Sequence, residues 1–149
     1  MSELPPRPEP VFGEDELSEF FTLPGWDPYE DMTGPMYEQR GDGPERRCAM
    51  RIEARHCNTW GIVHGGLMMS FADYATFALA RHALDGGGAV TVSMTSDFCA
   101  SARVGDLLEA EVEVMRETRS MVFVQGREFV GDRTVLSFSA VLKKMRGQS

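Results

Sequence analysis

The run Asn58-Thr59-Trp60-Gly61-Ile62-Val63-His64-Gly65-Gly66 and the apolar segment after it are the most informative part of the chain. From Ile62 to Ala80 the only formal charge is Asp73, with histidine taken as neutral. A lone carboxylate in an apolar helix is costly to bury, so its presence there indicates a function. The preceding run offers an amide side chain, two adjacent glycines and free backbone N–H groups at a helix start. These groups are suited to stabilising a developing negative charge.

Composition and charge describe one domain of ordinary globular character. The 149 residues are 42% hydrophobic and 26% charged, which allows one hydrophobic core but leaves too little chain for two comfortable domains. The formal net charge of −8 supplies no basic field for a phosphate backbone, so we expect no nucleic-acid partner. Three cysteines, an odd number, and no basic-then-apolar leader at the N-terminus favour a reducing cytoplasm.

Membrane and metal binding are both disfavoured by the pattern. The segment from Ile62 to Ala80 has nearly the length of a membrane span, but it contains two glycines, a serine and an aspartate. We therefore expect a buried helix and no membrane partner. The cysteines and the histidines His56, His64 and His82 lack the paired spacing of zinc ligands, so we expect no metal and no cofactor.

Residues 1–33 are expected to form an N-terminal extension outside the main domain. Four prolines precede Gly13 and predict a disordered tail up to that residue. The segment Glu14–Thr22 places apolar side chains on one side and predicts a short helix. The following Trp26–Asp31 predicts an irregular aromatic loop that packs over an edge of the core or, alternatively, covers a ligand channel.

Residues 34–145 are expected to form the main domain, followed by a short tail at 146–149. Runs of alternating or β-branched residues predict strands at 36–40, 48–55, 89–99, 107–116, 121–130 and 134–144. The last two strands form a hairpin around 131–133. One long helix is expected from about 65 to 84. Short connections between strands exclude a parallel crossover sheet, so the fold class is α+β, with one helix against an antiparallel sheet.

The long helix is apolar on both sides. Helical spacing gathers Met68, Phe71, Ala72, Ala75 and Leu79 on one side; the opposite side holds Met69, Asp73, Phe77 and Ala80. A sheet covers only one of these sides. The pattern therefore predicts a second copy of the chain on the other, with Asp73 at the seam.

The motif resembles that of a known family. The run Asn58-x-x-Gly61-x-x-His64-Gly65-Gly66, followed nine residues after the histidine by Asp73, is similar to the hotdog-fold acyl-CoA thioesterases of the phenylacetate-pathway type. The resemblance extends to Thr91-Val92-Ser93-Met94 and Ala102-Arg103-Val104-Gly105-Asp106, and it covers roughly residues 34–145. It implies a curved antiparallel sheet wrapped around one long central helix. It also implies dimers or tetramers with active sites between protomers.

The resemblance further implies hydrolysis of an acyl-CoA to a free acid and CoA, with a role for each motif residue. The Gly65 backbone N–H would polarise the thioester carbonyl at the positive end of the helix. Asp73 of the partner protomer would act as general base or nucleophile. Asn58 would orient water or the thioester. Thr91 stands where the family often has a serine that holds the water.

Substrate binding is implied for a second set of residues. His64 and Gly66 belong to the motif. For His64 we expect mainly a structural role in the helix-entry turn. Apolar candidates for the acyl site are Trp60, Met69, Phe77 and Phe98. Arg119 is the candidate for the phosphates of CoA, with Arg127, Lys143 and Lys144 as alternatives.

Three alternatives stay open. Asp73 could be a structural acid paired with Arg81 or Arg119. The chain could be a non-catalytic acyl-CoA-binding hotdog protein, although the presence of both Asn58 and Asp73 speaks against this. A hotdog hydratase or dehydratase needs a histidine and an acid a few residues apart. His64 and His82 each lie nine residues from Asp73, which fits that pairing poorly.

Overall fold

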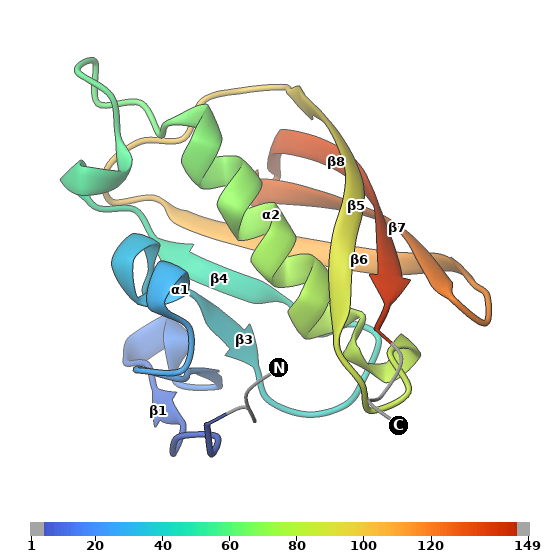
Figure 1. Ribbon diagram of the computed structural model, residues 1–149. Helices are drawn as coiled ribbons and strands as arrows, with labels where there is room; N and C mark the ends of the chain where they lie inside the picture. Colours follow the sequence, from blue (N-terminus) through green and yellow to red (C-terminus); the bar gives the residue numbers. More distant parts are fainter. Residues whose placement is uncertain (1–4, 146–149) are drawn as a thin grey trace.

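The computed structural model describes residues 5–145, which form an antiparallel sheet around a long helix (Figure 1). The strands are β1 (Val11–Phe12), β2 (Phe20–Thr22), β3 (Tyr37–Gln39), β4 (Cys48–Arg51), β5 (Ala89–Phe98), β6 (Leu107–Glu117), β7 (Met121–Val130) and β8 (Arg133–Lys144). The helices are α1 (Pro28–Thr33) and α2 (Gly65–Leu79), with 3₁₀ turns at Asp15–Leu17, Ala54–His56 and Arg81–Ala83. The sheet order is β1-β2-β3-β4-β6-β7-β8-β5. The α+β prediction, with one long helix on an antiparallel sheet, is confirmed.

Alternating side chains explain how the sheet buries one face. On β6, Leu108 and Ala110 are fully buried, whereas Glu111 and Glu113 are exposed. On β8 the same alternation buries every second residue: Leu136, Phe138, Ala140 and Leu142. The predicted hairpin between β7 and β8 is also confirmed, and its turn contains Gly131 at φ 59°. A positive φ of this kind is tolerated best by glycine.

The long helix is shorter than the sequence predicted. It ends at Leu79, and the residues up to Leu84 form a 3₁₀ turn instead of a further α-helical turn. Arg46 donates from Nη2 to the Ala78 carbonyl at 3.1 Å, which satisfies a terminal acceptor and fixes the helix end. Asp85 and Gly86 then adopt positive φ values and reverse the chain.

The two sides of α2 differ in burial largely as expected. The five side chains predicted to face the sheet are all buried: Met68, Phe71, Ala72, Ala75 and Leu79. On the other side Met69, Asp73 and Phe77 are half-buried. Ala80 departs from the prediction because it is fully buried in a cluster with Val122 and Leu142. The half-buried side of α2 carries Met69, Ser70, Asp73 and Phe77 and is called the outward stripe below. It lies between α1 on one side and β5 on the other (Figure 1).

The N-terminal segment corrects two predictions. Within the expected disordered tail, Val11 and Phe12 form β1 and pair with Thr22 and Phe21; residues 1–4 lie outside the described residues. The expected helix over 14–22 is wrong, because the segment contains a 3₁₀ turn followed by strand β2. Phenylalanine and threonine favour strands, and the open edge of β3 offers β2 a partner. The extension therefore adds strands to the sheet.

The expected aromatic loop contains a short helix, α1. Asp27 caps it, since its Oδ1 accepts hydrogen bonds from the backbone N–H groups of Tyr29 and Glu30 at 3.0 Å each. Pro28 occupies the first helical position, where its missing N–H costs nothing. The tail at 146–149 lies outside the described residues. No helix within residues 5–145 is long and apolar enough to cross a membrane.

Candidate active site

The first turn of α2 leaves one backbone donor without a partner. The His64 side chain caps the helix by accepting from the Gly66 N–H at 3.3 Å, and the His64 carbonyl accepts from Leu67 and Met68. Among residues 5–145 no acceptor lies on the Gly65 N–H. This donor lies at the positive end of a 15-residue helix, where an oxygen carrying partial negative charge is stabilised. Gly65 thus has the geometry that the sequence predicted, and His64 has a structural role beside it.

Asn58 holds the loop that leads into this turn. Its Oδ1 accepts from the N–H groups of Trp60 at 2.9 Å and Ile62 at 3.2 Å, while its own N–H donates to the Ile62 carbonyl. Gly61 completes the turn at φ 72°. The carbonyl half of the Asn58 amide is therefore committed to the loop. Only its NH₂ group, which has no partner within the described residues, is available to a ligand.

Asp73 and Thr91 are brought together between α2 and β5. The Thr91 hydroxyl donates to Asp73 Oδ1 at 2.6 Å, and both residues are half-buried. A hydroxyl has one proton, so in this arrangement Thr91 orients the carboxylate and cannot also donate to a water. Oδ2 of Asp73 has no partner within residues 5–145. The sequence pattern identified both residues but not their contact.

The alternative in which Asp73 pairs with an arginine is not what the structure contains. Arg81 donates instead to Oε1 of buried Glu38 at 3.0 Å. Arg46 and Arg7 lie near the same carboxylate, with N–O separations of 3.6 and 3.7 Å. This cluster of three arginines around Glu38 joins the N-terminal segment, the β3–β4 loop and the end of α2.

Gly65 and Asp73 are too far apart on α2 to act on one carbonyl group. They are separated by eight residues, which corresponds to about 12 Å along the helix axis. A complete site therefore needs either a second chain or a different pair of residues. This separation is the main geometric constraint on any mechanism.

The other residues predicted to bind substrate do not all lie beside this stripe. Trp60 is 79% exposed at the tip of its loop. Phe98, at the end of β5, packs on Gly65, since a Cβ atom added to Gly65 would lie 3.1 Å from the Phe98 ring. Arg119 belongs to the β6–β7 turn, and this turn lies at the opposite end of the sheet from the start of α2 (Figure 1). Its neighbour Ser120 accepts a hydrogen bond from Lys144 N. Within one protomer Arg119 therefore does not approach the first turn of α2.

Two groups beside the stripe were missed by the sequence analysis. The Tyr29 hydroxyl lies 2.6 Å from Ser70 Oγ, which links α1 to α2. Glu30 is half-buried, and its pKa is raised to about 7, mainly by burial and then by Asp27, Asp31, Glu38 and Asp73. The alternative in which Trp26–Asp31 covers a ligand channel was a signal for this segment, but it named neither Tyr29 nor Glu30 as a site residue.

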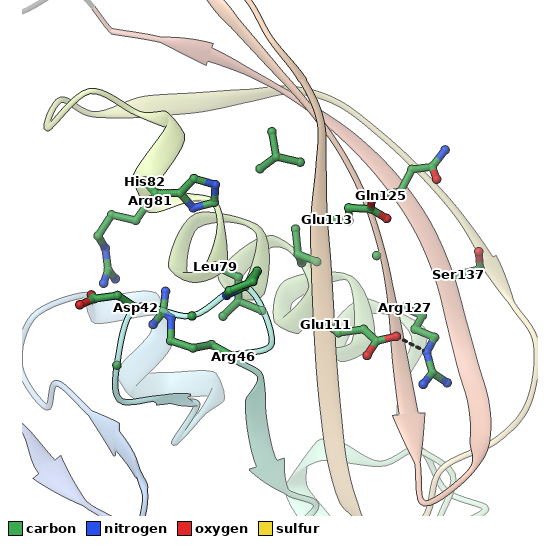
Figure 2. Close-up of a pocket in the computed structure, with 16 residues that line it drawn as sticks. Asp42, Arg46, Leu79, Arg81, His82, Glu111, Glu113, Gln125, Arg127 and Ser137 are labelled. Atoms are coloured by element: carbon green, nitrogen blue, oxygen red, sulfur yellow. Dashed lines mark hydrogen bonds and ion pairs between the residues drawn. The ribbon is translucent and has the colours of Figure 1, made fainter.

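A further cavity lies away from these residues. It has a volume of about 1140 Å³ between the β3–β4 loop, the end of α2 and strands β6 and β7 (Figure 2). Its three arginines are already paired: Arg127 donates to Glu111 at 2.6 Å, and Arg46 and Arg81 contact Glu38. Neither Gly65 nor Asp73 lines it. Residues 5–145 also contain no group of three His, Cys, Asp or Glu side chains placed to hold a metal ion.

Comparisons with known proteins identify the family. The family model described as the thioesterase superfamily matches residues 61–137. An esterase candidate of Pseudomonas aeruginosa is 36% identical over 115 residues, covering 76% of this chain and 86% of that protein. Acyl-coenzyme A thioesterase 13 of Mus musculus is 24% identical over 76 residues, covering 51% of this chain and 54% of that protein.

Solved structures agree on the fold. The Escherichia coli PaaI protein from the phenylacetic acid degradation operon superposes with a TM-score of 0.72 at 22% identity, covering 81% of this chain and 86% of that one. A hypothetical thioesterase of Streptococcus pneumoniae, solved with coenzyme A, gives a TM-score of 0.68 at 14% identity, covering 76% and 88%. From its helix start, its sheet and these similarities together, the chain belongs to the thioesterase superfamily and has the hotdog fold.

Proposed function

We propose that the protein hydrolyses an acyl-CoA thioester to a free acid and CoA. The observation that carries the proposal is the unpartnered Gly65 N–H at the start of α2, in a chain of the thioesterase superfamily. A thioester carbonyl oxygen gains negative charge when its carbon is attacked, and a fixed N–H at a helix N-terminus stabilises that charge. The CoA part of the substrate is supported by the mouse relative's name and by the coenzyme A in the Streptococcus structure.

Gly65 is suited to this role because it lacks a side chain. A methyl group there would lie 3.1 Å from the Phe98 ring and would crowd the approach of an acyl group. We assign Gly66 and His64 to substrate binding at the same turn. The His64 Nδ1 accepts from Gly66, so the proton of the neutral ring is on Nε2, where it is available as a donor.

Asp73 of the partner protomer is proposed as the second half of the site. As a general base it would take a proton from water, whose oxygen then attacks the carbonyl carbon. Collapse of the tetrahedral intermediate would break the C–S bond, and the proton would pass from Asp73 to the departing thiolate. As a nucleophile it would form a mixed anhydride that water then hydrolyses. In both cases Thr91 would hold the carboxylate in place, and the Asn58 NH₂ would orient the water or the thioester.

The assembly that this mechanism requires is a dimer, or a tetramer made of two dimers. The eight-residue separation of Gly65 and Asp73 on α2 excludes a site that uses both groups of the same protomer. Strand β5 lies at one edge of the sheet, and Val90 and Val92 on it are exposed. An exposed apolar edge strand is a ready surface for a second strand. Pairing of two β5 strands would join the sheets and bring the two α2 stripes together.

The rest of the substrate would contact the outer residues of this seam. We assign Met69 and Phe77, half-buried on the outward stripe, and Trp60 at the loop tip to substrate binding. Arg119 would contact a CoA phosphate only at a site formed with another protomer. The three free cysteines agree with a reducing, cytoplasmic location, which is proposed on that basis.

The test is thiol release from aryl-acetyl, benzoyl, short-chain and long-chain acyl-CoAs, comparing wild type with Asp73→Asn. We expect hydrolysis that depends on Asp73. Tight binding of acyl-CoA without turnover of any substrate would instead indicate the non-catalytic binding protein.

A further inference from the structure

Helix α1 is fixed rigidly beside the start of α2. Asp27 caps the N-terminus of α1. In addition, Arg55 donates to the Met32 carbonyl at 2.8 Å and to the Gly34 carbonyl. The buried His56 ring accepts from Glu53 N at 3.0 Å and faces the Gly34 carbonyl with Nε2 at 3.3 Å. The His56 carbonyl in turn accepts from His64 N. The end of α1 and the cap of α2 are thus held by the same short segment.

A chain of hydroxyl groups connects α1 to the stripe that carries the proposed catalytic groups. Ser70 donates its single proton to the Gly66 carbonyl at 2.9 Å, so Tyr29 must be the donor to Ser70 Oγ. Ser70 lies one helical turn after Gly66 and one turn before Asp73 on the same side of α2. Tyr29 therefore stands beside this stripe, with its ring 54% exposed.

A cavity of about 340 Å³ lies between these elements. It is lined by Tyr29, Met32 and Thr33 from α1, by His64, Leu67 and Ser70 from the start of α2, and by 55–57. Its volume is at the lower end of the range for small-molecule sites. Met32 is 66% exposed although it is a large apolar side chain. Large exposed side chains that line a concave surface are typical of ligand contacts.

We propose that α1 is the wall that limits the size of the acyl group, with Tyr29 and Met32 closing the far end of this cavity. The inference rests on the proposed function, since the acyl group enters from the Gly65 end past His64. The volume suits a short-chain or single-ring acyl group. Removing either side chain enlarges the cavity and admits longer groups.

The experiment measures dissociation constants for non-hydrolysable acyl-CoA thioether analogues with acyl chains of two to sixteen carbons. Wild type is compared with Tyr29→Ala, Met32→Ala, Tyr29→Phe and Met115→Ala. Tyr29→Phe keeps the ring and removes the hydroxyl; Met115 is an equally exposed methionine on β6, away from the cavity. Binding to analogues separates this inference from catalysis.

We expect wild type to prefer the short analogues, and we expect Tyr29→Ala and Met32→Ala to shift the long-to-short affinity ratio by about tenfold toward long chains. Tyr29→Phe and Met115→Ala should keep the wild-type ratio. An unchanged ratio in both alanine variants, in a protein that binds the analogues and hydrolyses acyl-CoA, would overturn this inference alone. If no analogue bound wild type, the proposed function and this inference would both be overturned.

Discussion

The two ends of α2 are built in opposite ways. At its start, the Gly65 N–H has no acceptor among residues 5–145, and half-buried polar groups lie nearby. At its end, Arg46 donates to the Ala78 carbonyl, and Ala80 N donates to Thr76. Beside this end Glu38, 2% exposed, is surrounded by three arginines. An end whose helix carbonyl and charges are paired stabilises the fold, whereas an end with a free donor can bind a reacting group.

The largest expected effect tests the functional half of this contrast. Asp73→Asn keeps the shape of the side chain and removes its basicity, so we expect turnover to fall about a thousandfold with little change in folding. Thiol release and thermal unfolding measure the two effects. Asp97→Asn, an exposed aspartate on β5, is the matched control. Asp132→Asn, in the exposed β7–β8 turn and away from the proposed β5 interface, is a second control. Activity of Asp73→Asn within a few-fold of wild type would remove Asp73 from the mechanism.

The next effect tests the structural half. Glu38→Gln leaves the largely buried Arg46 without its counter-charge, so we expect a loss of about 3 kcal/mol in the free energy of unfolding. Because this cluster is remote from Gly65, kcat per folded molecule should stay near wild type. Urea unfolding and thiol release measure both quantities, with the exposed Glu113→Gln as control. A large fall in kcat without loss of stability would mean that the two ends are not separate in function.

A smaller effect is expected at the start of α2. Gly65→Ala adds a methyl group 3.1 Å from the Phe98 ring and crowds the acyl group, so we expect kcat to fall about tenfold to a hundredfold. Gly88→Ala is the control, since a Cβ there meets nothing within 4 Å and its φ is not positive. The double variant Gly65→Ala/Phe98→Ala tests whether the added methyl group acts by displacing the Phe98 ring or by crowding the acyl group. If the double variant recovered full activity, displacement of Phe98 would be the whole effect, and the proposed crowding of the acyl group at Gly65 would lose its support.

The smallest effect concerns the charge beside the start of α2. The pKa of Glu30 is raised to about 7 in the folded protein, compared with an ordinary 4.5. Its contribution to stability is therefore fully present below pH 4.5 and is lost as the pH rises through 7. With solvent screening of this half-buried group, the loss is about 1 kcal/mol. Glu30→Gln does not undergo this loss. Between pH 4.5 and 8 its free energy of unfolding should therefore rise by about 1 kcal/mol relative to that of wild type. A constant difference over this range would contradict the raised pKa.

Local patterns predicted most of the sheet and the beginning of α2. Alternation along β6 and β8 and the glycine-rich entry before Met68 depend on neighbouring residues, so they can be read from the sequence. The N-terminal strands could not, because their helix-like spacing was overridden by pairing with the edge of β3. Glu128 is a second example of an environment that its neighbours in the sequence do not reveal. It is fully buried on β7 without a hydrogen-bond partner in the described residues, and burial raises its pKa well above the ordinary value.

The candidate site was predicted in part for the same reason. The identities of Gly65, Asp73 and Thr91 followed from spacing and resemblance. The Tyr29–Ser70 contact joins residues 41 positions apart, and no local pattern encodes it. Nor does spacing reveal that the Asn58 carbonyl holds its own loop, or that Arg119 lies at the far end of the sheet.

The most direct test of the central claim is subunit complementation. Two inactive variants, Asp73→Asn and Gly65→Val, are mixed, exchanged by mild denaturation and refolding, and assayed for thiol release, with subunit exchange verified by mass. In a mixed dimer, one site combines the intact Gly65 of one chain with the intact Asp73 of the other. Random exchange therefore predicts recovery of about a quarter of wild-type activity. Mixed dimers that stay inactive would show that the two groups do not form one site between protomers.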